Sequence, residues 1–134
     1  MKTYFHVDIL TPYGKYLSTE ADYLSVTSGL GVLGILPNHA PLVTTLEISK
    51  LVIKCDNREN NYAIGGGIMH IKEGNQIVLL LNSIESPEEI DLKRAEEAKD
   101  RAEKRLLEKN NIDVVRAKTA LSKALNRISV YELK

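Results

Sequence analysis

Hydrophobic positions along the chain follow two periodicities, and the change between them falls near residue 86. Before it, apolar residues alternate with polar ones or form short runs between turn residues, as in the segment from Phe5 to Ile9, where His6 falls on the polar, solvent-facing side. After it, apolar residues recur at helical spacing. The pattern predicts an α+β chain with an antiparallel β-sandwich over residues 1–86 and an antiparallel two-helix hairpin over residues 87–134.

Turn residues divide the first part into short strands. Strands are expected at residues 3–10, 15–21, 22–27, 42–48, 50–55, 62–71 and 76–81, with a polar hairpin loop at residues 56–61. The glycine triplet Gly65–Gly67 lies inside one of these strands and lacks the helix and lysine that follow a phosphate-binding loop. It indicates a bend at which another backbone passes closely.

The segment from Gly31 to Leu42 is the most individual part of the first region. Pro37 and Pro41 bracket a constrained loop with Asn38 and His39 at its tip. Functional contacts concentrate in rigidly held loops, so this tip is a candidate partner contact. The alternative is a histidine hydrogen-bonded to the local backbone.

The second region contains one motif twice. Ile90-Asp91-Leu92-Lys93-Arg94-Ala95 recurs as Ile112-Asp113-Val114-Val115-Arg116-Ala117, and residues 108–111 separate the two predicted helices. Asp91 can cap the first helix, because its carboxylate accepts free backbone N–H groups. The predicted apolar stripes are rich in alanine and therefore bury little area, so the hairpin is expected to open easily. They are Leu92, Ala95, Ala98, Ala102 and Leu106 in the first helix and Val114, Ala117, Ala120, Leu121, Ala124, Leu125 and Ile128 in the second.

The charged residues of the two predicted helices are compatible with either a ligand-binding surface or an ordinary solvated one. Arg94, Arg101 and Arg105 are seven and four residues apart, so they form one stripe with Asp91 at its head, which suits an anionic ligand. A solvated face laced with local ion pairs is the alternative. Residues 112–134 carry five Lys or Arg against two Asp or Glu, which favours an acidic partner.

Composition argues against several classes of partner and of catalytic chemistry. The formal net charge is zero and Trp is absent, so neither nucleic acid nor a membrane surface is indicated as a partner. Cys55 is the only cysteine, and no apolar run reaches the length needed to cross a bilayer. The three histidines lie on separate elements with no metal-ligand spacing or catalytic triad around them. We therefore expect a soluble cytoplasmic protein that binds or regulates rather than an enzyme.

Three features together resemble a known family. They are Gly34-Ile35-Leu36-Pro37-Asn38-His39-Ala40-Pro41-Leu42, then Gly66-Gly67, then the doubled Ile-Asp-x-x-Arg-Ala helices. In this order they resemble the epsilon subunit of bacterial F-type ATP synthase, over essentially the whole chain. The resemblance implies a non-catalytic subunit of the rotating central stalk, which couples proton translocation to ATP synthesis. Its sandwich would bind the gamma subunit and the c-ring.

In several bacterial members of that family the folded hairpin binds ATP through an Ile/Leu-Asp-x-x-Arg-Ala motif, an upstream glutamate and a downstream arginine. By this resemblance Glu85 and Asp91 would contact the adenosine part, Ile90 and Ala95 would border the base, and phosphates would be held by Arg94 and Arg101. Arg105 is a further candidate. ATP would act as a regulatory ligand, and the motif does not itself require Mg²⁺.

The resemblance also implies that the hairpin inhibits ATP hydrolysis, a role called a brake below. The extended hairpin would inhibit ATP hydrolysis by meeting the alpha and beta subunits, with Arg116, Lys123 and Arg127 as the basic contacts. The complex would place the chain peripherally at the cytoplasmic face of the cell membrane, without insertion. Many members carry Glu at Val32 and Gly at Asn38; the first change removes a polar contact, whereas Asn still tolerates a left-handed turn. A free-standing adaptor whose basic hairpin grips an acidic partner, including nucleic acid, is the alternative function.

Overall fold

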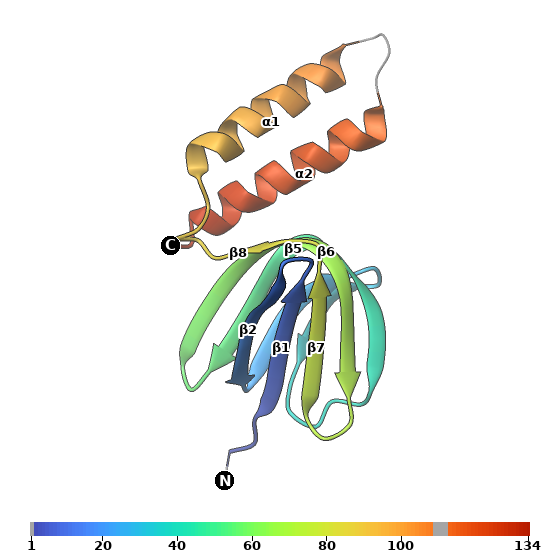
Figure 1. The fold of residues 1–134 in the computed structure, drawn as a ribbon, viewed down its shortest axis with the longest axis vertical. Helices are drawn as coiled ribbons and strands as arrows, with labels where there is room; N and C mark the ends of the chain where they lie inside the picture. Colours follow the sequence, from blue (N-terminus) through green and yellow to red (C-terminus); the bar gives the residue numbers. More distant parts are fainter. Residues whose placement is uncertain (1, 109–112) are drawn as a thin grey trace.

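A computed structural model describes residues 2–108 and 113–134, and it confirms the predicted α+β architecture (Figure 1). The elements are β1 (Phe5–Thr11), β2 (Gly14–Ala21), β3 (Tyr23–Ser28), β4 (Gly31–Ile35), β5 (Leu42–Cys55), β6 (Arg58–Lys72), β7 (Gln76–Leu81), β8 (Ile84–Glu85), α1 (Leu92–Leu107) and α2 (Val114–Tyr131). The strands form a sandwich, and the two helices lie together at one end of it.

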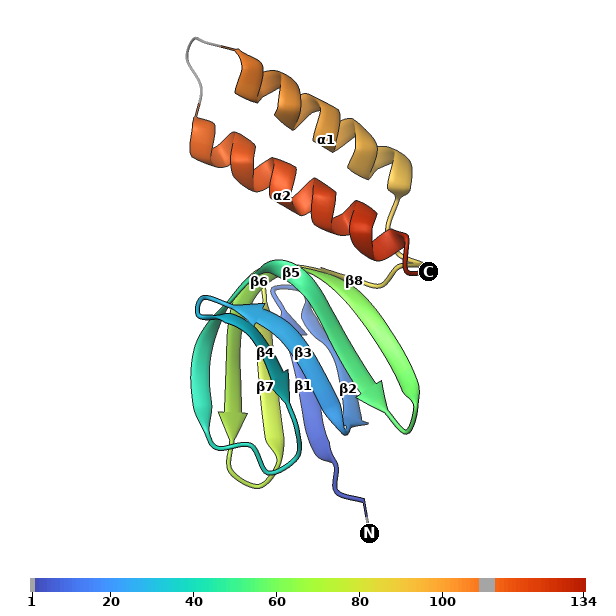
Figure 2. The same cartoon turned by 180° about the vertical axis from the view of Figure 1, so that it is seen from behind.

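The sandwich is one eight-stranded sheet folded over on itself. Its order is β2-β1-β7-β6-β5-β3-β4, with β8 paired to β6. The long strands β5 and β6 bend and pass from one layer into the other, as Figures 1 and 2 show. All the ladders are antiparallel apart from β1 with β7, which is parallel. A parallel neighbour was not predicted, because alternation along a strand does not reveal the direction of its neighbour.

One apolar cluster fills the space between the layers. Phe5, Val7 and Ile9 of β1 are almost fully buried, as their alternation predicted, and they meet inward residues such as Leu79 and Met69. Burial of this kind contributes roughly 25 cal/mol per Å² of apolar surface, so this cluster is the main source of stability.

A tight turn before β6 and a glycine triplet within it determine the path of this strand. The predicted loop at residues 56–61 is wrong: only Asp56 and Asn57 form the turn, both with positive φ, and β6 begins at Arg58. Asn and Asp tolerate this conformation, which makes a two-residue hairpin turn. Farther along, the predicted close approach at the glycine triplet is confirmed, because a Cβ atom at Gly67 would lie 2.1 Å from the Leu80 carbonyl oxygen.

The two helices lie antiparallel with an alanine-lined seam between them (Figure 1). Asp91 caps α1 as predicted, accepting a hydrogen bond from the Arg94 backbone N–H at 3.1 Å, and Asp113 caps α2 in the same way. Ala95, Ala102, Ala117 and Ala124 are buried in the described helices. Of the predicted connection at residues 108–111, residues 109–111 lie outside the described residues, as does Ile112 of the repeat.

The predicted apolar stripe of α2 is wrong at two positions. Val114 and Leu125 are 47% and 45% exposed, whereas Val130, which the stripe omitted, is fully buried. The reason is that α2 also faces the sandwich. Val130 and Tyr131 pack with Ile90 and Ala63 in a small cluster, here called the docking interface. None of the described helices is long and apolar enough to span a membrane.

Candidate functional site

Two of the predicted ligand residues meet in a groove between the helices. This interhelical groove has a volume of about 380 Å³ and is lined by Ala98, Arg101, Ala102, Arg105, Ala117 and Ala120. Small alanine side chains leave the space open, and the guanidinium groups of Arg101 and Arg105 flank it from exposed positions one helical turn apart. Two guanidinium forks beside an open groove suit a phosphate group.

The remaining residues of the motif are distributed differently. Arg94 is exposed and lies two turns before Arg101, outside the lining of the interhelical groove. Asp91 is exposed but already accepts the capping hydrogen bond. Ile90 and Ala95 are buried, by the docking interface and the helical seam respectively. The folded hairpin therefore covers the two apolar residues that the resemblance assigns to the base.

Glu85 contacts a residue that the sequence did not pair with it. Its carboxylate forms an ion pair with the Arg127 guanidinium, with 2.5 Å between Oε1 and Nε. The two side chains are 29% and 34% exposed, so solvent only partly screens the pair. Glu85 was expected to serve ATP and Arg127 to serve the extended hairpin. In the folded hairpin these two side chains are instead paired with each other.

A second polar contact fixes α2 beside this ion pair. The Asn126 side-chain amide donates to the Ser49 carbonyl at 2.7 Å and lies 3.4 Å from the Ile64 carbonyl. Ser49 of β5 and Ile64 of β6 are register partners, and these two strands bend beneath the helix (Figure 2). Lys123, one turn before Arg127, is half-buried next to them, whereas Arg116 is exposed. The three predicted basic residues of α2 therefore do not form one free stripe in this arrangement.

The segment between the sandwich and α1 is tied to β2. The Tyr16 hydroxyl donates a hydrogen bond to the Glu89 carboxylate, which also accepts one from the Ser86 backbone N–H at 2.9 Å. Burial opposes ionisation of Glu89, but these hydrogen bonds outweigh it and hold the pKa of the carboxyl below its ordinary value. This anchor, which the sequence did not reveal, fixes the point from which the hairpin leaves the sandwich.

The predicted tip loop lies at the end of the sandwich away from the helices (Figure 2). Asn38 has φ +67°, so the expected left-handed turn is confirmed. Its backbone N–H donates to the Asn75 side-chain oxygen at 2.6 Å, which joins the loop to the β6–β7 turn. His39 is exposed, and its Nδ1 lies 2.7 Å from the Ala40 carbonyl, the local contact weighed as an alternative.

The outer face of the sheet carries exposed apolar residues that the sequence did not single out. Thr45, Ile68, Leu80 and Leu10 lie in register across β5, β6, β7 and β1. Ile68 and Leu80 are 45% and 49% exposed, and Val43, two residues from Thr45 on the same face, is 64% exposed. Alternation along a strand cannot distinguish a solvated face from a covered one. A contiguous apolar face of this kind is typical of a protein interface.

His6 was expected to be solvated, and this is wrong. Its Nδ1 lies 3.0 Å from the Glu20 carboxylate, and its Nε2 lies 3.2 Å from Asp8 and 2.8 Å from the Ser18 hydroxyl. The hydrogen bond to Glu20 is the largest of the effects that raise the pKa of His6 above its ordinary value. The pattern placed His6 on the polar face correctly but could not reveal that Glu20 of the neighbouring strand β2 lies opposite it.

Two family models cover the chain. The β-sandwich domain of the ATP synthase delta/epsilon chain matches residues 4–87, and the long α-helix domain of the same chain matches residues 88–132. Among solved structures, the chain is similar in fold to one in the mitochondrial ATP synthase of Euglena gracilis. The TM-score is 0.80 at 16% identity, covering 100% of this chain and 84% of that one.

Curated relatives extend over nearly the full length. The ATP synthase epsilon chain of Desulforamulus reducens is 43% identical over 127 residues, covering 94% of this chain and 96% of the relative. That of Bacillus cytotoxicus is 39% identical over 135 residues, covering all of both chains. That of Desulfitobacterium hafniense strain Y51 is 38% identical over 125 residues, covering 93% and 94%. The predicted resemblance is confirmed, and the chain belongs to the ATP synthase delta/epsilon chain family.

Proposed function

We propose that this chain is the non-catalytic, regulatory epsilon subunit of the central stalk of an F-type ATP synthase, coupling proton translocation to ATP synthesis. The observation that carries this proposal is that the fold consists of two structurally separate parts. A sandwich with its own core presents an exposed apolar sheet face, while a separately attached hairpin lies at one end. Relatives that share the full length are named ATP synthase epsilon chains, which supports the assignment.

The gamma subunit is the proposed partner of the exposed face that contains Val43, Ile68 and Leu80. Covering these exposed apolar side chains would be favourable, and none of them belongs to the docking interface, so the face can be occupied whichever way the hairpin lies. The c-ring is the proposed partner of the Asn38–His39 tip, which is held rigidly by Asn75. These contacts would hold the subunit peripherally at the cytoplasmic face of the membrane.

Co-purification with the gamma subunit tests the docking part. A chain ending at Ser86 should still join gamma, because the main core cluster draws only on residues before that point. Ile68→Glu should abolish the association by placing a charge in the apolar face, while Lys93→Glu on α1 serves as the matched control. Retained binding by the Ile68 variant, or lost binding by the truncated chain, would contradict the proposal.

ATP is the proposed regulatory ligand of the folded hairpin, with its phosphates at the interhelical groove. Arg101 and Arg105 supply donors there, and Arg94 lies on the same side of α1 toward Asp91. Because Ile90 and Ala95 are covered and Glu85 is paired with Arg127, adenosine contacts would require a shift of the hairpin and a new partner for Arg127. Phosphate binding would therefore leave the hairpin in place, whereas adenosine binding would require it to shift. Mg²⁺ could accompany the phosphates but has no protein ligand set in the motif.

Isothermal calorimetry tests this site. Arg101→Ala should weaken ATP binding about ten- to hundredfold, since a lost charge-assisted hydrogen bond costs about 1.5–3 kcal/mol. Arg94→Ala should have an effect in the same direction. Lys99→Ala is the matched control, because Lys99 is paired with Glu103 on α1 outside the lining of the groove. Unchanged affinity in both arginine variants would remove the nucleotide assignment.

The hairpin is the proposed brake on ATP hydrolysis. A ligand that binds only the folded form stabilises it by about 2.7 kcal/mol at one hundred times its dissociation constant. When ATP is scarce the helices would extend toward the alpha and beta subunits, with Arg116, Lys123 and Arg127 exposed to acidic residues there. Steady-state hydrolysis by the reconstituted complex at low ATP should therefore rise when all three are changed to Ala. Equal inhibition by the wild type and the triple variant would defeat the brake.

A further inference from the structure

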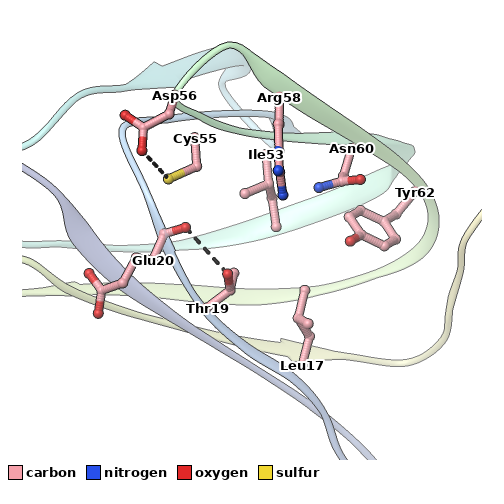
Figure 3. Close-up of a pocket in the computed structure, with 9 residues that line it drawn as sticks. All are labelled: Leu17, Thr19, Glu20, Ile53, Cys55, Asp56, Arg58, Asn60 and Tyr62. Carbon is pink, nitrogen blue, oxygen red and sulfur yellow. Dashed lines mark hydrogen bonds between the residues drawn. The ribbon is translucent and has the colours of Figure 1, made fainter.

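The sandwich has a cavity on its open side, remote from the interhelical groove. Its volume is about 590 Å³, and it lies between β2 and the hairpin arm formed by the end of β5 and the start of β6. We call it the lateral cavity. Its principal lining residues are Leu17, Thr19, Ile53, Arg58, Asn60 and Tyr62 (Figure 3).

The cavity exists because the folded sheet does not close. β2 is the terminal strand of the order and pairs with β1 alone. On the other side, β6 pairs with β7 only from Gly67 onward and with β8 at Ala63 and Ile64. The two layers therefore separate beside Arg58, and no strand of the described chain fills the gap.

The floor of the lateral cavity is apolar and rigid. Ile53 and Tyr62 are buried members of the core, and Leu17 packs against the same cluster. The Tyr62 ring meets the Tyr16 ring edge-on, with 6.2 Å between the centroids and 88° between the planes. An apolar floor of fixed shape with a few polar groups at its mouth is the usual construction of a small-molecule site.

The acidic groups around the mouth already contact residues outside it. Glu20 lies 3.0 Å from His6, and Asp56 lies 3.1 Å from the Lys2 ammonium group while accepting a hydrogen bond from Tyr4 at 2.7 Å. Burial raises the pKa of the Cys55 thiol, which keeps this neighbour uncharged. Both carboxylates at this mouth are thus engaged by other side chains, and Lys2 is shared between Asp56 and Asp22.

Arg58 is different. Its side chain points into the lateral cavity, which Ile53 and Asn60 also line (Figure 3). It takes part in none of the ion pairs formed within residues 2–108 and 113–134. A guanidinium presents planar N–H donors that match a carboxylate in a two-bond arrangement. Donors at the mouth and an apolar floor below them select a ligand with an acidic head and a hydrocarbon tail.

We propose that the lateral cavity is a binding site for a small carboxylate with an apolar chain, such as a medium-chain acyl carboxylate. The carboxylate would meet Arg58 and Asn60, and the chain would lie on Leu17, Ile53 and Tyr62. The site is distinct from the nucleotide site proposed above and does not depend on it, because it uses no residue of the hairpin.

Titration of the full-length, isotope-labelled chain by NMR tests this site with three probes. Octanoate carries both features, 1-octanol lacks the charge, and inorganic phosphate lacks the tail. Octanoate should shift the amides around Leu17, Ile53 and Arg58 and should bind about tenfold or more tightly than either of the other probes. Equal affinity for octanoate and octanol, absence of octanoate binding, or shifts confined to the helices would overturn the proposal.

Two variants distinguish the contribution of the carboxylate head from that of the apolar tail. Arg58→Gln should weaken octanoate about ten- to hundredfold and leave octanol unchanged, whereas Leu17→Gln should weaken both. Lys54→Gln is the matched control, because Lys54 is a neighbouring cation that pairs with Glu59 at 3.5 Å. Thermal unfolding establishes that each variant is folded. Octanoate should also slow alkylation of Cys55, the only cysteine of the chain, and an unaltered alkylation rate at saturation would contradict the assigned position.

Discussion

The sandwich and the hairpin are held together by different physical means. The sandwich has one large apolar cluster whose members come from all of the strands β1 to β8, distant in sequence. The hairpin has an alanine seam and a docking interface of four residues, supplemented by the Glu85–Arg127 pair and the Asn126 hydrogen bond. The first arrangement is shared among many contacts, whereas the second depends on a few. This difference suits a rigid docking part and a movable regulatory part.

The largest effect is expected in the sandwich core. Ile9→Ala should lower the free energy of unfolding by about 2–5 kcal/mol, because Ile9 is fully buried and the surrounding strands cannot collapse onto the space left behind. Chemical denaturation followed by circular dichroism measures the loss. Leu107→Ala on the hairpin is the control, since that side chain is 81% exposed. Equal losses in the two variants would remove the contrast between the two regions.

A smaller and more local effect is expected at the docking interface. Ile90→Ala should release α2 from the sandwich at a cost of about 2 kcal/mol, the lower end of the range for a buried aliphatic side chain, because the cluster is small. Amide hydrogen exchange should speed up in α2 while the strands of the core keep their protection. Faster exchange throughout the sandwich would show that the two regions unfold together, contrary to our interpretation.

The ion pair beside that interface should contribute less. Glu85→Gln or Arg127→Gln should each loosen the docked helix by about 1 kcal/mol, since both side chains are partly exposed and solvent screens the attraction. A double-mutant cycle read by hydrogen exchange in α2 isolates the coupling between them. Additive effects in the double variant would mean that the two side chains do not stabilise docking as a pair.

The sequence predicted local features better than contacts between regions. The β1 alternation, the Asp91 cap and the close approach at Gly67 each follow from a few neighbouring residues, and all were confirmed. Val130 was missed because its burial depends on the sandwich beneath α2. The same limit applies to the candidate site. The nucleotide motif named Glu85 and the basic stripe of the second helix named Arg127, but their pairing depends on where α2 docks, and spacing along the chain does not contain that information.

The smallest expected effect is a pH dependence of the sandwich through His6. Its pKa is raised in the folded chain, chiefly by the hydrogen bond with Glu20 and further by Asp8. A raised folded pKa means that protonated His6 stabilises the fold. This contribution is complete below the unfolded pKa of about 6.5 and is lost as pH rises through the folded pKa.

Thermal unfolding of the wild type and the His6→Gln variant at about pH 6 and pH 8 measures this contribution. The wild type should lose more stability than the variant between the two values, because the variant has no proton to release at this position. Glu20→Gln should reduce the difference, since it removes the partner that raises the pKa most. Because the histidine bridges β1 and β2 rather than the docking interface, exchange in α2 should respond to pH equally in the wild type and the variant. A His6-dependent change confined to α2 would instead place this titration in the regulatory hairpin and reverse the comparison between the two regions.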